Sequence, residues 1–212
     1  MIERKEQTPP NEGPTEIKRF SDRTRERLRK SGYVIYLLGT SVSEMRVEGR
    51  SFSVGWNENE PDFERGRSFG GEVAVNPRYL FLSDSEKQDQ QGNIQAVSFL
   101  SKRVVASFPG ARVIMGSAVD YMALFFAHLD ATGETLFETN TTVKEGRRII
   151  VTRTTSTLPP ETEFQTNNNA NGRYTRDLNV AVISSRCHIQ IGSAFRHNPN
   201  IYTGVAPLII PT

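Results

Sequence analysis

The first residues whose types and spacing suggest chemistry lie where a short apolar strand leads into a helix. Gly116 and Ser117 follow the β-prone run 113–115, and Tyr121 comes about one helical turn after Ser117. The free N–H groups and positive dipole end of a helix start suit an anion, so Gly116, Ser117 and Tyr121 are the predicted anion-binding residues. The alternative is structural: Ser117 caps the helix, in an S-x-x-D pattern with Asp120, and Tyr121 packs at the boundary of the core.

Neither a catalytic pair nor a set of metal ligands is predicted. His128 shares a helical stripe with Ser117 but lies about 16 Å along the axis, too far for a nucleophile–base pair. His128, Asp130 and Glu134 match no helical ligand spacing such as H-E-x-x-H. Cys187 is the only cysteine, which excludes an internal disulfide and a cysteine-based metal cluster. We therefore expect no catalytic residue, no metal and no cofactor.

The second group of residues is a predicted basic helix over 21–30. Ser21 or Asp22 can cap its start, and Leu28 is its only large apolar residue, so the helix must pack on a neighbour. Its cations can neutralise phosphates, and the predicted nucleic-acid-binding residues are Arg23, Arg25, Arg27, Arg29 and Lys30. Ion pairs within the helix are the alternative. The pI near 8.8 lies below the range above roughly 9 that is typical of a dedicated nucleic-acid-binding domain.

Charge is unevenly distributed along the chain. Residues 1–31 carry nine basic and six acidic side chains, residues 32–143 carry nine and 14, and residues 144–212 carry eight and four, for a net charge of +2. The basic ends predict either a phosphate-rich or acidic partner or attraction between the ends and the acidic middle.

Hydrophobic periodicity predicts an α/β fold, with α+β as the alternative. Residues 33–38 are predicted as a strand buried on both faces, with further short strands over 72–76, 79–82 and 112–115. A helix from about 93 to 108 has one apolar stripe, made of Ile94, Val97, Leu100, Val104 and Phe108. A second helix follows Ser117 and ends at Gly133. These elements predict a small mixed sheet with about three helices.

The chain divides into three predicted regions. Residues 1–18 are a flexible N-terminal tail, residues 19–138 an α/β domain, and residues 139–212 a β-rich extension with a mobile Asn-rich loop near 159–172. The aromatic-rich segment 40–71 is predicted either to be an irregular cover over the core or to carry function. In the extension, strands are predicted over 147–155, 178–183 and 188–191, the last two forming a hairpin. Residues 205–210 contain Pro207 and are predicted to form at most an edge strand.

Residues 23–137 resemble uncharacterised bacterial hypothetical proteins. The similar segments are RTRERLRKSGYVIYLLG, EVAVNPRYLFL and DYMALFFAHLDATGETLF. The resemblance covers a little over half of the chain. It implies a bacterial-type cytoplasmic domain and assigns no activity and no site residues. A cytoplasmic location also agrees with the single cysteine and with the absence of an apolar secretion-signal segment at the start.

Together these patterns predict a non-catalytic binding or interaction module that engages nucleic acid or another anionic partner. A small hydrolase or transferase acting at the helix start near Ser117 is one alternative. Another is an oligomeric assembly subunit, with the apolar segment 205–211 and the aromatic residues of 52–69 as contact surfaces. No membrane partner is expected, because no apolar run approaches the ~18 residues that a membrane-spanning helix needs.

Overall fold

The computed structural model describes residues 17–54, 63, 65–82, 90–136, 150–157, 176–182, 188–195 and 203–212. They form two β-sheets and four α-helices, which confirms the predicted α/β class. The described helices include none that is long and apolar enough to cross a bilayer. In chain order the elements are α1 (Asp22–Lys30), β1 (Val34–Leu38), α2 (Val42–Val47), β2 (Ser51–Val54), β3 (Gly71–Val75), the 3-10 helix η1 (Pro77–Tyr79), α4 (Gln90–Ser107), β4 (Ala111–Met115), α5 (Ala118–Thr132), β5 (Ile150–Thr157), β6 (Arg176–Val182), β7 (His188–Phe195), β8 (Thr203–Gly204) and β9 (Pro207–Pro211).

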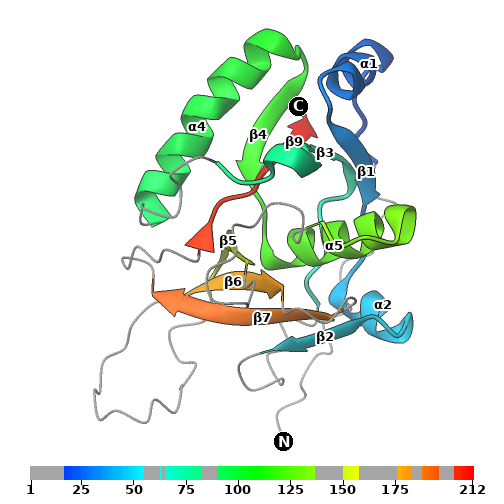
Figure 1. Ribbon diagram of the computed structural model, residues 1–212, viewed down its shortest axis with the longest axis vertical. Helices are drawn as coiled ribbons and strands as arrows, with labels where there is room; N and C mark the ends of the chain where they lie inside the picture. Colours follow the sequence, from blue (N-terminus) through cyan, green and yellow to red (C-terminus); the bar gives the residue numbers. More distant parts are fainter. Residues whose placement is uncertain are drawn as a thin grey trace, which may run out of the picture.

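Two sheets organise the molecule (Figure 1). The first has the strand order β1-β3-β9-β4 and is antiparallel throughout. The second has the order β2-β7-β6-β5-β8 and is mixed, because β2 runs parallel to β7 and β8 runs parallel to β5. Each sheet takes one strand from the far side of the predicted boundary at 138, since β2 joins the second sheet and β9 joins the first.

Strand β9 occupies the interior of the first sheet, between β3 and β4. The prediction of at most an edge strand for 205–210 is therefore wrong. Pro207 and Pro211 lie at the two ends of β9, opposite Met115 and Ala111, so the residues between them keep their N–H groups for the ladder. Leu208, Ile209 and Ile210 are buried in the core. The predicted use of this segment as a contact surface between copies is also wrong.

Helices cover both faces of the first sheet. Alternate residues of β9 separate the two sides: Ile209 packs in the cluster that contains Leu28 of α1 and Val104 of α4, whereas Leu208 and Ile210 pack in the cluster that contains α5. The α5 cluster also contains Ile189 and Ile191 of β7. Figure 1 shows the resulting stack, with α5 between the two sheets and α1 and α4 beyond the first sheet.

Because sheets lie on both sides, α5 is buried around its whole circumference rather than along one stripe. Every residue from 118 to 126 is buried, and so is His128. The predicted ends of this helix are confirmed. Ser117 and Asp120 form a capping box, and Gly133 follows the helix in the left-handed conformation at φ 73°.

Strand β1 is an edge strand, and the prediction that it is buried on both faces is wrong. Tyr36 and Leu38 are buried, whereas Val34 and Leu37 are 39% and 55% exposed. The apolar run matches a central strand in composition, but among the described strands β1 has a neighbour, β3, on one side only. Leu37 lies opposite Glu72 of β3 in the register of the sheet.

The segment 40–71 contains regular structure that the sequence analysis missed. Ser41 and Glu44 form a capping box that begins α2, and β2 pairs with β7. The S-x-x-E spacing is present in the sequence, but the apolar periodicity after it is too short to predict a helix. The expected cover over the core is nevertheless present, since Phe52, Phe63 and Phe69 pack against the α5 cluster.

Two further predictions differ from the structure. The strand predicted over 79–82 is wrong: the chain instead forms η1, with Pro77 at its first position and Tyr79 exposed. Helix α4 begins at Gln90. Ile94 does not belong to the buried stripe that was predicted, since its side chain is 45% exposed. The rest of that stripe packs inward.

The predicted hairpin is confirmed, with β6 antiparallel to β7 from the pair Arg176 and Phe195 to the pair Val182 and Ile189. The predicted tail lies outside the described residues up to residue 16, as does the Asn-rich loop near 159–172.

The interior position of β9 predicts a large stability difference between two identical substitutions. Leu208→Ala removes a fully buried side chain and is expected to lower the free energy of unfolding by about 2–5 kcal/mol. Leu37→Ala removes a side chain that is 55% exposed, and we expect a loss below about 1 kcal/mol. Urea unfolding of both variants measures the difference. Equal losses would contradict the placement of β9 inside the sheet.

Candidate functional site

The predicted anion site at the start of α5 already holds a carboxylate from the protein itself. Asp120 Oδ2 accepts a hydrogen bond from the Ser117 N–H at 2.7 Å, and Asp120 Oδ1 accepts one from the Phe69 N–H at 2.6 Å. Ser117 Oγ in turn accepts from the Asp120 N–H at 3.1 Å. The positive end of the helix is therefore compensated by Asp120, which is itself buried.

Tyr121 accepts the hydrogen bond of the second backbone donor at this helix start, the Gly116 N–H. Its hydroxyl accepts from the Gly116 N–H at 3.1 Å and donates to the Ala206 carbonyl at 2.5 Å. The Tyr121 side chain is fully buried, and this burial raises its pKa. A Cβ atom at Gly116 would approach Leu208 Cδ1 to 2.6 Å, so the strand–helix junction is closely packed.

Gly116, Ser117 and Tyr121 are thus brought together as expected, but their donors face internal acceptors. An external anion would have to displace Asp120 from Ser117 and break the contact between Tyr121 and Gly116. Anion binding at this position stays a prediction. The observed geometry is that of a capped helix start joined to the β9 segment through Ala206.

His128 lies in the interior and pairs with a tyrosine instead of approaching Ser117. Its Nδ1 is 2.5 Å from the Tyr36 hydroxyl, across the contact between α5 and β1. The two rings meet edge to face, with centroids 5.8 Å apart. Burial lowers the pKa of His128, although the charge of Glu134 opposes that shift, and burial raises the pKa of Tyr36 to about 12. At neutral pH the pair is uncharged, which is the form that a buried site favours.

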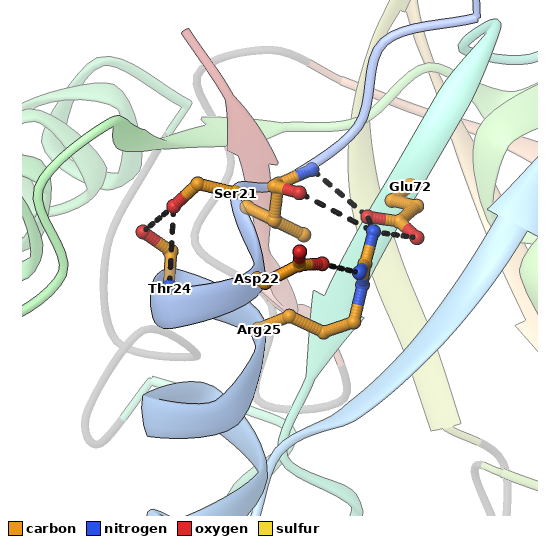
Figure 2. Close-up of polar contacts among 6 residues, drawn as sticks. Ser21, Asp22, Thr24, Arg25 and Glu72 are labelled. Carbon is orange, nitrogen blue, oxygen red and sulfur yellow. Dashed lines mark hydrogen bonds and ion pairs between the residues drawn. The ribbon is translucent and has the colours of Figure 1, made fainter.

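The basic helix α1 is held firmly against the first sheet (Figure 2). Ser21 caps its start by accepting from the Thr24 N–H, and Thr24 Oγ1 donates to the Pro109 carbonyl at 2.8 Å. Arg25 Nη2 contacts both carboxylate oxygens of Glu72 on β3, at 3.1 and 3.2 Å. Leu28 is completely buried in the hydrophobic cluster that also contains Val104 of α4 and Ile209 of β9. These contacts fix which side of α1 faces the sheet.

The side chains of α1 that do not contact the sheet are open to solvent, and most of them are cationic. Arg23, Arg27 and Arg29 are exposed, and none of the three forms an ion pair with another residue of the described chain. Lys30 is also exposed and pairs with Glu26 at 2.7 Å. Arg25 differs from the other four predicted nucleic-acid-binding residues, because its guanidinium contacts Asp22 and the half-buried Glu72. The structure separates one anchoring arginine from a cationic outer face.

The other residues with chemical potential do not come together as a site within the described part of the chain. No group of three or more His, Cys, Asp or Glu side chains suited to a metal ion occurs among them. Asp130 instead receives both Nη atoms of Arg50, each at 2.6 Å, an ion pair that lowers the pKa of Asp130. Cys187 lies outside the described part of the chain.

Sequence reasoning missed Glu72 as the partner that holds Arg25 against the first sheet. The two residues are separated by 47 positions, so only the sheet brings them together. It also missed Tyr79, which is 78% exposed, because the run 79–82 was assigned to a strand.

The division among the arginines of α1 is testable by single substitutions. Arg25→Gln removes two charge-assisted hydrogen bonds to Glu72 and is expected to lower the free energy of unfolding by about 1–3 kcal/mol. Arg29→Gln should change it by less than about 0.5 kcal/mol. Chemical denaturation of both variants provides the measurement, and similar losses in the two would show that Arg25 has no anchoring role.

His128 predicts that acid weakens the fold. Its pKa is lowered in the folded state, so the unfolded chain binds the proton first as the pH falls. The contribution of neutral His128 is therefore present above its ordinary value of 6.5 and is lost progressively below it. The free energy of unfolding should fall more between pH 7.5 and 5.5 in the natural protein than in His128→Gln. An identical fall in both would assign the pH dependence to other groups.

Comparison of this chain with protein-family models, with curated proteins and with solved structures finds no match.

Proposed function

We propose that the protein is a non-catalytic binding module that engages an anionic partner through the outer face of α1. This face consists of Arg23, Arg27, Arg29 and Lys30 and is named the basic face below. The observation that carries the proposal is the set of three exposed arginines without an ion pair among the described residues, on a helix whose other side is fixed to the sheet.

The anchoring of α1 supports binding as well as stability. A cationic helix free to move would lose conformational freedom when a partner ordered it. Here Thr24, Arg25 and Leu28 already hold the backbone of α1 in place. An anionic partner then needs to order only the arginine side chains, whose planar guanidinium groups suit the paired oxygens of phosphate or carboxylate.

The basic face is preferred over the alternative of a hydrolase or transferase site at Ser117. The N–H groups of Gly116 and Ser117 contact Tyr121 and Asp120, so an anionic substrate at that helix start must first displace protein groups. No such displacement is needed at Arg23, Arg27 and Arg29, which form no ion pair with a described residue. We place the module in a reducing compartment such as the cytoplasm, in keeping with the single cysteine of the chain.

Charge reversal on the basic face tests the proposal. The triple variant Arg23→Glu, Arg27→Glu, Arg29→Glu leaves Arg25 in place and should lose retention on immobilised heparin. Binding to a single-stranded polyanion should also become less salt-dependent. At about 0.7 per phosphate contact, three lost contacts lower the slope of log affinity against log salt by about 2.

A matched control changes the same amount of charge elsewhere. Lys102, Arg103 and Arg112 are exposed on α4 and β4, and their replacement by Glu alters the net charge identically. This control should keep most of the salt slope and of the heparin retention. Equal weakening by the two triple variants, with both still folded by circular dichroism, would mean that net charge rather than the basic face determines binding.

A further inference from the structure

The turn that follows β3 lies beside the end of α1. Strand β1 begins just after α1, and its first residue, Val34, pairs with Val75 at the end of β3. The chain leaves β3 through Asn76 and enters η1. A Cβ atom placed on Gly32 would lie 3.7 Å from Asn76 Nδ2, so the end of α1 and the start of η1 are neighbours.

This neighbouring turn presents an aromatic ring and a cation to solvent. Tyr79 is 78% exposed, and Arg78 beside it is also exposed. Neither side chain has an ion pair, side-chain hydrogen bond or ring contact with any residue that the structure describes.

The turn is nevertheless held in place from both sides. Asn76 Oδ1 accepts from the Arg78 N–H at 3.0 Å, and Pro77 fixes the backbone at the first position of η1. After Tyr79, the Leu80 side chain is buried in the core and the Leu82 N–H donates to the Val205 carbonyl at 2.9 Å. Tyr79 is therefore a ring on an ordered support, with an open face.

Tyr33 is a weaker candidate for the same role. Its ring packs edge to face on Phe108 at 5.8 Å, and burial raises the pKa of its hydroxyl. Tyr79 is the exposed ring on the turn that Asn76 places next to the end of α1.

We propose that the anionic partner is a single-stranded nucleic acid, with a base stacked on Tyr79 and the adjoining phosphates on Arg78 and the basic face. This inference rests on the proposed function and specifies its ligand. Cations alone fit any polyanion, but an exposed ring beside Arg78, on the turn next to the end of a cationic helix, matches a ligand that alternates phosphates with planar bases. A duplex keeps its bases stacked within the helix and cannot offer one to Tyr79.

Fluorescence anisotropy with a labelled single-stranded oligothymidylate tests the proposal. Tyr79→Ala should weaken binding about 5- to 150-fold, which is the range that loss of one stacked base implies. Tyr79→Phe keeps the ring and should bind within about 2-fold of the natural protein. Phe99→Ala truncates an aromatic ring on α4 that is 66% exposed and should leave affinity unchanged.

Inorganic polyphosphate is the second probe, because it carries phosphates without bases. Tyr79→Ala should bind it as the natural protein does, whereas the triple variant of the basic face should lose both probes. If Tyr79→Ala binds the oligonucleotide normally while the triple variant does not, the stacking inference fails and the proposed function stands. If the triple variant keeps both probes, the proposed function fails.

Two further outcomes would overturn the choice of ligand. One is a matching duplex that loses as much affinity as the single strand in Tyr79→Ala. The other is a loss of binding to vesicles of phosphatidylserine and phosphatidylcholine in Tyr79→Ala with unchanged oligonucleotide affinity, which would assign Tyr79 to a membrane surface. Thermal unfolding of each variant verifies that the fold is intact.

Discussion

The insertion of β9 between β3 and β4 is the contact on which the rest of the structure depends. Strands β1 and β3 form one pair and β4 stands apart from them, so the first sheet is continuous only through β9. Ile209 supplies the outer core under α1 and α4, and Leu208 and Ile210 supply the inner core over α5. Residues at the end of the described chain therefore stabilise helices that lie much earlier in the sequence.

Helix α5 shows how this arrangement also determines the chemistry of the predicted anion site. Because sheets lie on both of its sides, the start of α5 is enclosed, and its N–H groups must find partners within the protein. Asp120 and Tyr121 supply those partners. The same enclosure places His128 against Tyr36, where a neutral pair is stabilised. Residues with catalytic potential thus serve packing and hydrogen bonding in the interior.

Helix α1 shows the opposite outcome, in which anchoring leaves chemistry at the surface. Glu72 binds Arg25 and thereby fixes α1 on the sheet, while Arg23, Arg27 and Arg29 remain open to solvent. The register of β1 on β3 brings η1 beside the end of this helix. Binding in our proposal thus uses one helix and one turn that are adjacent only because two strands pair.

The sequence by itself determined the local features, since each depends on residues that lie close together along the chain. These include the capping box of Ser117 and Asp120, the end of α5 at Gly133, the cationic character of α1 and the β6–β7 hairpin. Tertiary structure decided the features that depend on pairing between distant segments. It alone placed β9 inside a sheet, exposed β1 at an edge, gave Arg25 a partner 47 positions away and joined Asp120 to the Phe69 N–H, 51 positions away. Local sequence patterns fix backbone preferences, whereas burial and long-range partners depend on which surfaces the folded chain brings together.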